Sequence, residues 1–372
     1  MFKYLKFSLF YCLSTFAVVM ILLGQHWIIV GYIGTTSFIV IGDTFLGDDT
    51  SVPVYHWPLI LKLQLWLAFP LLTILMLVSI WSVSATDIFT IGSTLTQLFN
   101  YDFNLAKDST QWWQHCIGLF YVGLMTSIIG TVVGHELVHR TTDKISVCIG
   151  RWLLAFSFDS NFSIEHVYGH HRYVATPDDP ATAPRERNVY QHIILSTCGG
   201  NISAWNIEKT RLKRRHKPLF SLHNVFIRGV LMSLTLLFSA YIMADWIAVI
   251  YCSLIALSSK VLLEIVNYME HYGLVRENNK PVAPRHSWNT NKKMSSWSMF
   301  NLSRHSHHHA QGHIPFHQLK PYEDAPIMLN GYLGTICITL IPPLWFKLMK
   351  PKLQHWDHVY ATEHERELLR NC

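Results

Sequence analysis

Twenty-two of the 372 residues are histidines, and ten of them gather in four short boxes. The boxes read HELVHR (135–140), EHVYGHH (165–171), NYMEHYG (267–273) and RHSHHH (304–309). Histidine is the commonest metal ligand among side chains, so this clustering indicates metal chemistry. One histidine in an apolar segment could equally be a hydrogen-bonded packing residue, but four boxes in one chain favour a metal site.

The spacing within the boxes lets several imidazoles reach one ion. Residues i and i+4 lie on one face of a helix, as His135 and His139 would in the first box. In the second box the same rule pairs His166 with His170 and leaves His171 on the neighbouring edge. The first box also matches the helix of zinc proteases, but the chain offers more ligands than the four that one zinc ion takes.

The fourth box adds three imidazoles, because His305 should share a helical face with His308 and His309, while His307 projects away from it. Nine candidate ligands suit two ions with open positions. Imidazole binds iron, copper and zinc alike, so the ligand type leaves the metal open. The candidate ligands are His135, His139, His166, His170, His171, His271, His305, His308 and His309.

Acidic and amide residues stand beside these histidines in the sequence. A metal-bound imidazole usually donates its other N–H to such a group, which fixes the tautomer and the ring orientation. For Asp178 and Asp179, between two prolines, a structural turn is the alternative. The candidates for holding the ligands in place are Glu136, Glu165, Asp178, Asp179, Asn267, Glu270 and His286.

The elements that must position these residues are membrane helices. Half of the residues are hydrophobic and only 15% are charged, against about 25% in a soluble domain. The apolar residues come in runs of about 20, long enough to cross the roughly 30 Å hydrocarbon layer. A last apolar stretch, 327–346, contains two prolines and should be interfacial. We expect an all-α integral membrane fold with six transmembrane helices, at about 7–23, 26–42, 58–82, 113–134, 223–243 and 246–264.

The distribution of basic residues predicts the orientation. Six crossings put both ends of the chain on one side, together with Lys3, Lys6 and the basic segment 209–217, and that side should be cytoplasmic. The boxes lie at helix ends on the same side. The sequence therefore predicts one domain over residues 1–372, in which a cytoplasmic histidine-rich helical cap, about 135–222 and 265–372, holds a di-metal site.

Charge and cysteine content limit the partners. The net charge of +6 comes without clustered basic and aromatic faces, so nucleic acid is not indicated. Seven scattered cysteines form no C-x-x-C pair, which excludes a fused rubredoxin, so any electron carrier must be a separate protein. A basic patch could dock an acidic carrier, although such residues also set topology at the lipid surface. Its members are Lys209, Arg211, Lys213, Arg214 and Arg215.

Taken in order, HELVHR, EHVYGHH with ATPDDPA downstream, NYMEHYG and RHSHHHA resemble the membrane alkane 1-monooxygenases, within the fatty acid desaturase-like superfamily. The resemblance runs from about the second predicted helix to about residue 350, and NYMEHYG is its most specific string. It implies two non-haem iron ions held by the nine histidines, and O2-dependent hydroxylation of the terminal methyl group of an alkane or similar aliphatic chain. It also implies electrons from a rubredoxin and its reductase, and a place in the bacterial inner membrane with the active site on the cytoplasmic side.

Three departures leave the substrate and the donor open. His307 stands where alkane enzymes more often carry an acid, and Arg140 where many have lysine. The tail 356–367 looks more like the xylene-type monooxygenases, which oxidise a benzylic methyl group and use a ferredoxin-type reductase. A fatty acyl desaturase is a further alternative. A non-catalytic metal-binding membrane protein or transporter is disfavoured, because transporters usually place polar groups at the membrane midplane.

Two expectations concern single residues. Trp57, Leu61, Leu65 and Trp66 on the third predicted helix are candidates for the wall of a substrate channel, with a lipid-facing stripe as the alternative. Replacing His271 by alanine should remove activity and lower bound iron, whereas replacing His307 should have a mild effect.

Overall fold

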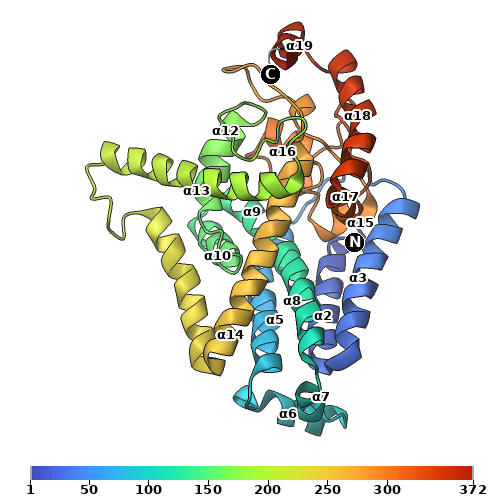
Figure 1. Cartoon of the computed structure of the whole chain (residues 1–372), viewed down its shortest axis with the longest axis vertical. Helices are drawn as coiled ribbons and strands as arrows, with labels where there is room; N and C mark the ends of the chain where they lie inside the picture. Colours follow the sequence, from blue (N-terminus) through green and yellow to red (C-terminus); the bar gives the residue numbers. More distant parts are fainter. Residues whose placement is uncertain (1, 371–372) are drawn as a thin grey trace.

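The computed structural model describes residues 2–370, and within this range the chain is all-helical, with two isolated β-bridges. Long apolar helices form a bundle, a cap of shorter helices and loops covers one end, and α6 and α7 lie at the other end (Figure 1). The expected all-α class is confirmed. The helices of the bundle and of its far end are α2 (Ser8–Leu23), α3 (Gln25–Phe45), α4 (Pro58–Trp66), α5 (Ala68–Val83), α6 (Ile91–Phe99), α7 (Phe103–Asp108), α8 (Trp112–Thr126), α9 (Val133–Val138) and α14 (Val225–His271).

Four helical segments of the described chain are long and apolar enough to cross a membrane, which makes the chain an integral membrane protein. A bent pair, α17 (Tyr332–Thr339) with α18 (Pro342–Val359), could be a fifth span. The helix α2, at 16 residues, is shorter than these. Six crossings therefore stay a prediction. The four segments are Gln25–Phe45, Pro58–Val83, Trp112–Val138 and Val225–His271.

The helix α14 is divided into two arms by a break in its middle. Its 47 residues would reach about 70 Å if straight, more than twice the thickness of the hydrocarbon layer. Ala244 (φ −151°, ψ 37°) and Asp245 (φ 54°, ψ −157°) leave the helical conformation, in the gap between the predicted helices 223–243 and 246–264. Figure 1 shows the first arm descending from the cap and the second returning to it. The second arm thereby carries the third box, at its end, back to the cap.

Two segments of π-helix interrupt the helices that carry the first two boxes. Ser127–Val132 joins α8 to α9, and His166–His170 joins α11 (Phe162–Glu165) to α12 (His171–Tyr173). A π segment places i and i+5 together instead of i and i+4, and such segments often occur at functional sites. The second therefore changes which histidines of its box face the same way.

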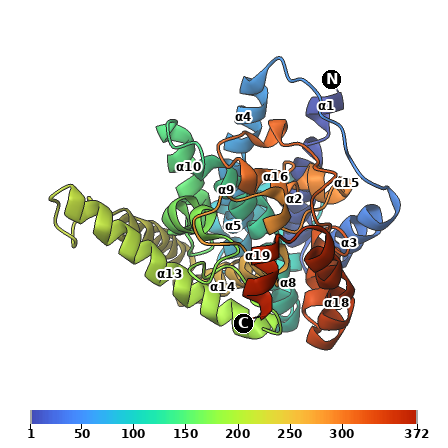
Figure 2. The same ribbon diagram turned by 90° about the horizontal axis from the view of Figure 1, so that it is seen from above.

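The cap is built from α10 to α13 and from the elements after α14. The helix α13 (Val189–Arg214) lies across the bundle and extends beyond it at one side (Figures 1 and 2). At the C-terminal end, Pro342 and Pro343 begin α18, and its axis turns by 119° from that of α17. The remaining cap helices are α10 (Lys144–Ala155), α15 (Lys293–Ser298), α16 (His305–Ala310) and α19 (Glu363–Arg370).

Candidate metal centre

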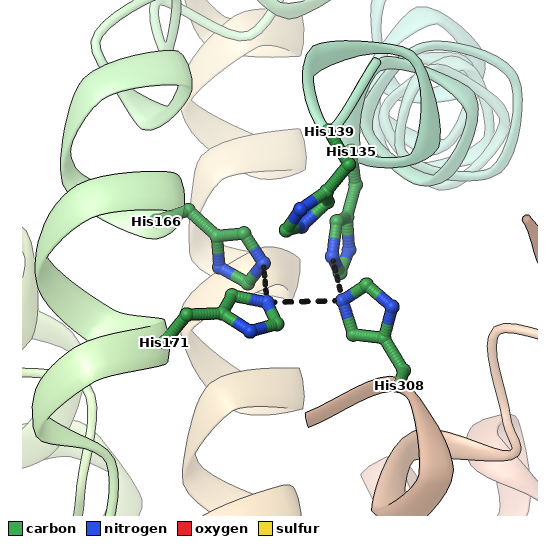
Figure 3. Close-up of side chains that lie close together, drawn as sticks. All are labelled: His135, His139, His166, His171 and His308. Atoms are coloured by element: carbon green, nitrogen blue, oxygen red, sulfur yellow. Dashed lines mark hydrogen bonds between the residues drawn. The ribbon is translucent and has the colours of Figure 1, made fainter. Parts of the chain in front are cut away.

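The nine candidate histidines come together in two groups beneath the cap. Within each group the ligand atoms all lie within 4.8 Å of one another. The five-histidine cluster comprises His135, His139, His166, His171 and His308, and Figure 3 shows their rings pointing toward one another. The four-histidine cluster comprises His170, His271, His305 and His309.

The five-histidine cluster has the geometry of a ligand shell. The Nε2 atom of His308 lies 2.8 Å from the Nε2 atom of His135 and 3.1 Å from the Nε2 atom of His171. The Nε2 atoms of His171 and His166 are 3.0 Å apart. Two nitrogens each about 2.1 Å from one ion, at a right angle, are roughly 3 Å apart. The buried Nε2 atom of His139 has no hydrogen-bond partner among the described residues. These residues fit a metal ion at the point where the nitrogens converge.

The four-histidine cluster repeats this arrangement beside the first. The Nε2 atoms of His170 and His309 are 3.2 Å apart, and so are those of His305 and His271. All four residues are buried. Since His170 and His171 adjoin in the sequence but belong to different clusters, the two groups share a boundary along the second box.

The pairing expected within the second box is wrong. The i, i+4 rule paired His166 with His170, but the π segment brings His166 and His171, five residues apart, into one cluster and turns His170 into the other. The short string of this box gave no sign of the extra residue in the turn.

The fourth box is also divided between the clusters. His305 and His309 are one α-helical turn apart on α16 and enter the four-histidine cluster together, whereas His308 faces the other cluster. His307 lies outside both, as expected: its Nδ1 atom accepts a hydrogen bond from the Lys320 backbone N–H at 2.7 Å, and its ring packs on Tyr322. Dividing the box gives each cluster at least one histidine from α16.

Burial keeps most of these imidazoles neutral. In six of them it is the largest cause of a pKa well below the usual 6.5, and neighbouring histidines add to it. A neutral imidazole offers the lone pair that a metal ion needs. The six residues are His139, His166, His171, His305, His308 and His309.

Asp179 holds His170 in place. Its Oδ2 atom is 2.9 Å from the Nδ1 atom of His170, and the hydroxyl of Thr182 donates to the same oxygen at 2.6 Å. Burial lowers the pKa of His170, but the charge and the hydrogen bond of Asp179 outweigh it, so that the pKa is raised. This carboxylate directs Nε2 of His170 toward the other ligands. Asp178, the other candidate of the pair, is exposed in the turn and is not brought to the clusters.

His286 contacts the site through its backbone and not through its imidazole. Its carbonyl oxygen lies 3.4 Å from the Nδ1 atom of His271. The imidazole instead accepts a hydrogen bond from the Ala283 backbone N–H at 3.0 Å and binds Glu365 at 2.8 Å. The expected role for its side chain is therefore replaced by a link between the metal centre and α19.

Glu270 lies at the edge of the four-histidine cluster. Its Oε2 atom is 3.2 Å from the Nε2 atom of His305, and the Tyr332 hydroxyl donates to Oε1 at 2.5 Å. Tyr332 was not among the sequence candidates, because nothing in the neighbouring sequence marks it. The Nε2 atom of His305 thus lies between Glu270 on one side and the Nε2 atom of His271 on the other. Glu270 is the one candidate acid with such a contact to a nitrogen that faces another histidine.

Two of the three remaining candidates have other partners. Glu136 pairs with Arg140 and accepts a hydrogen bond from the Phe316 backbone N–H at 3.2 Å. Asn267 donates to Glu264 at 3.1 Å. Glu165 is buried with one oxygen lacking a hydrogen-bond partner among the described residues, and burial, then the charge of Asp179, raises its pKa to about 8.

An apolar cavity with an empty volume of about 830 Å³ opens onto both clusters. His135, His166 and His305 lie in its wall, together with Glu270. The rest of the wall comes mainly from α8, the π segment after it, α14, α15 and α17. The expected wall residues on the third predicted helix are not part of it, so that prediction is wrong: Trp57 is exposed, and Leu61 and Leu65 pack into the core.

A smaller, polar cavity of about 410 Å³ lies against His166 and His170. Its wall includes Lys260, whose ammonium group is 2.9 Å from Asp159 and 2.6 Å from Glu264. This group was not predicted from the sequence. The signal was present, since Lys260 and Glu264 stand one turn apart in an otherwise apolar helix, where ionisable residues are rare and functional.

The sequence was compared with those of known proteins and families. Residues 110–336, more than half of the chain, match the fatty acid desaturase family. The chain belongs to this family. All four boxes fall inside the matched region, so the family and the two clusters together indicate metal binding.

Several named proteins resemble the chain over much of its length. It is 36% identical over 247 residues to alkane 1-monooxygenase 1 of Pseudomonas aeruginosa. The aligned region covers 65% of this chain and 64% of that protein, a little under two thirds of each. It is 34% identical to alkane 1-monooxygenase 2 of the same organism, over 70% of each. The xylene/toluene monooxygenase hydroxylase component of Pseudomonas putida is 34% identical over 63% of this chain and 64% of that protein. The resemblance to the alkane 1-monooxygenases is thus confirmed.

Proposed function

We propose that the chain is a di-iron, O2-dependent monooxygenase that converts the terminal methyl group of an n-alkane, or of a similar aliphatic chain, to a primary alcohol. The observation that carries this proposal is the apolar cavity whose wall contains histidines of both clusters. A saturated chain offers no polar group for recognition, so it must be bound by shape and apolar contact. The similarity to the alkane 1-monooxygenases supports the same reaction.

The nine histidines would hold two iron ions, five on one and four on the other. Bound iron supplies the O2 chemistry and electron transfer that amino-acid side chains lack. In the balanced reaction, RH, O2, two electrons and two protons give ROH and water: one oxygen atom enters the C–H bond and the other leaves as water. Imidazole also suits zinc and copper, so the choice of iron rests on the family resemblance.

The chain's own residues orient the ligands and exclude water. The carboxylate of Asp179 fixes the ring of His170, and the carbonyl of His286 faces the Nδ1 atom of His271. Apolar side chains such as Leu263 and Ile336 keep the substrate side of the site dry. A dry wall protects reactive oxygen species from side reactions with solvent.

For the membrane setting we propose six crossings in one domain of the bacterial inner membrane, with the cap on the cytoplasmic side. The two arms of α14 count as two spans, and α2 as the shortest. Electrons would come from a rubredoxin with its reductase. The exposed Lys209, Lys213, Arg214 and Arg215 support docking of an acidic carrier. Arg211 is taken out of this patch by its hydrogen bonds to Glu208.

A second candidate is hydroxylation of an aromatic methyl group, with a ferredoxin-type donor. It is favoured by the 34% identity to the xylene/toluene hydroxylase component, close to the values for the alkane enzymes. The same apolar cavity and the same clusters would serve it, so the two candidates differ in substrate and not in metal chemistry.

Product analysis tests the proposal. The chain is expressed with a rubredoxin and its reductase and fed n-octane, n-hexadecane, m-xylene and a long-chain fatty ester, and the products are read by gas chromatography–mass spectrometry. We expect primary alkanols, absent from a His271→Ala control. A benzylic alcohol alone would move the chain to the second candidate. An olefin from the ester would make it a desaturase, and full activity of the control would contradict the ligand assignment.

A further inference from the structure

A groove separate from the metal centre lies between α10 and the first arm of α14, beneath α13 at the edge of the molecule (Figure 1). Its empty volume is about 1010 Å³. The lining residues recur at intervals of three and four along both helices, so one face of each helix lines the groove. They are Lys144, Val147, Cys148, Arg151 and Trp152 from α10, Arg228, Leu231, Met232 and Thr235 from α14, and Thr141 before α10.

The groove carries three cations, Lys144, Arg151 and Arg228, and none of its lining residues in the described chain is a carboxylate. Burial, and then the charge of Arg228, lower the pKa of Arg151 to about 10, so Arg151 remains charged at neutral pH. The charge of Glu208 acts on both Arg151 and Arg228, but this carboxylate already accepts hydrogen bonds from Arg211 and from the Val225 backbone N–H. One carboxylate, shared with Arg211, thus faces the three cations of the groove, which keeps an excess of positive charge.

Arg151 is the buried charged side chain in the wall of the groove. It is only 8% exposed, and its Nη2 atom donates to the Val225 carbonyl at 2.8 Å. Its Nε atom is buried without a hydrogen-bond partner among the described residues. A buried guanidinium with a free donor is costly unless a ligand satisfies it. Phosphate oxygens accept such bonds well, because the planar arrangement of N–H groups matches them.

The other part of the groove is apolar and lies at headgroup depth. Leu231 is 43% exposed in the isolated chain, and Met232 and Trp152 lie beside it in the wall. Arg228 is the fourth residue of a membrane-spanning helix, so it is about 5 Å from the helix end, the depth at which arginine reaches lipid headgroups. A ligand with one anionic group and a long apolar tail would satisfy both parts.

We propose that this groove binds one anionic glycerophospholipid, with its phosphate between Arg151 and Arg228 and an acyl chain along Leu231 and Met232. Basic pockets between membrane helices are a recurring form of lipid recognition. The proposal concerns a surface away from the histidine clusters and does not depend on the reaction they catalyse.

The test measures lipid binding to the purified full chain. The protein is placed in nanodiscs of phosphatidylcholine, with or without phosphatidylglycerol, and retained lipid is counted by native mass spectrometry alongside the midpoint of thermal unfolding. The variants are Arg228→Gln alone and Arg151→Gln with Arg228→Gln. The matched control, Arg214→Gln with Arg215→Gln, removes two exposed charges from the chain segment at the end of α13.

We expect one phosphatidylglycerol molecule retained by the unaltered chain and by the control, and a higher unfolding midpoint in the anionic nanodisc. Each arginine removed should weaken retention roughly tenfold, the value of one charge-assisted hydrogen bond. The single variant keeps the test valid if the buried Arg151 is needed for folding. Equal losses in the control, equal retention of both lipids, or equal stabilisation by inorganic phosphate in phosphatidylcholine nanodiscs would overturn the proposal of a lipid site.

Discussion

The two cavities beside the metal centre differ in almost every property except their shared wall. The larger is lined by apolar residues of α8, α14 and α17, and the smaller buries an ammonium group between two carboxylates. Phe162, His166 and Asn267 line both cavities. A layer one side chain thick therefore separates an apolar compartment from a polar one.

This division matches the two kinds of molecule that the proposed reaction must handle. The hydrocarbon has only dispersion and the hydrophobic effect to hold it, which an apolar wall provides. Protons and product water need polar groups, which would be costly in that wall. Substrate binding and polar chemistry thus meet at the histidines from opposite sides. Changes on the two sides should then have separable effects.

The largest expected effect is in the five-histidine cluster, whose member His166 lines both cavities. Replacing His308 by alanine removes the nitrogen that lies close to both His135 and His171, so we expect activity to fall by at least about 100-fold and bound metal to fall toward one ion per chain. The measurement is hydroxylation rate with metal analysis. His307→Gln, one residue away on α16, is the matched control and should keep both metal ions; loss of metal in that control would mean that the fourth box is misassigned.

On the polar side, Lys260→Met should lower the free energy of unfolding by about 3–5 kcal/mol, because it leaves Asp159 and Glu264 buried without their partner. The measurement is thermal unfolding of the purified protein. Adding Asp159→Asn and Glu264→Gln to the same chain should recover part of the loss. The ratio of octane to hexadecane oxidation should stay unchanged, and a shift in that ratio would contradict the separation of the two cavities.

On the apolar side, Ile336→Trp fills part of the cavity without changing a charge. We expect hexadecane oxidation to fall about tenfold relative to octane, since a chain that no longer fits loses one to two kcal/mol of apolar contact. Metal content should be unchanged. Leu344→Trp, a partly exposed position on α18, is the control, and equal losses in both variants would point to a folding defect instead of cavity volume.

The smallest effect is expected outside both cavities, where Glu365 fastens α19 to the cap through His286 and Arg285. Although burial opposes it, these hydrogen bonds lower the pKa of Glu365 from 4.5 to about 2. A lowered carboxyl pKa stabilises the fold above pH 4.5, and this contribution decays as the pH falls toward 2. Glu365→Gln should therefore lose about 1–2 kcal/mol at pH 7 and nothing near pH 2, as read by denaturant unfolding; an equal loss at both pH values would contradict the link.

The sequence predicted which histidines come together better than how they are divided. The four boxes named all nine members of the two clusters, because a chain rarely gathers so many histidines near membrane helices unless they bind metal. The pairing within the second box could not be predicted, since a π segment differs from an α-helix by one residue per turn and leaves no mark in so short a string. Asp178 and Asp179 could not be told apart either, because a turn decides which of two neighbours faces inward.

The residues of the apolar cavity wall could not be predicted from the sequence, for a different reason. Trp57 and Trp66 are bulky residues of one predicted helix and were candidates for the wall. The observed wall instead joins residues as distant in the sequence as Ile39, Leu263 and Ile336. Such contacts depend on how helices pack, which periodicity within one helix does not specify. Lys260 was the opposite case: its position in an apolar helix was visible in the sequence and pointed to the polar cavity.

The central claim is that the two clusters bind two metal ions, and that these are iron. Anomalous diffraction at the iron absorption edge, from crystals of protein grown with iron, tests it most directly. We predict two anomalous peaks per chain, one among the five histidines around His308 and one among the four around His271. A single peak, a peak outside these clusters, or a signal that appears only at the zinc edge would contradict the claim.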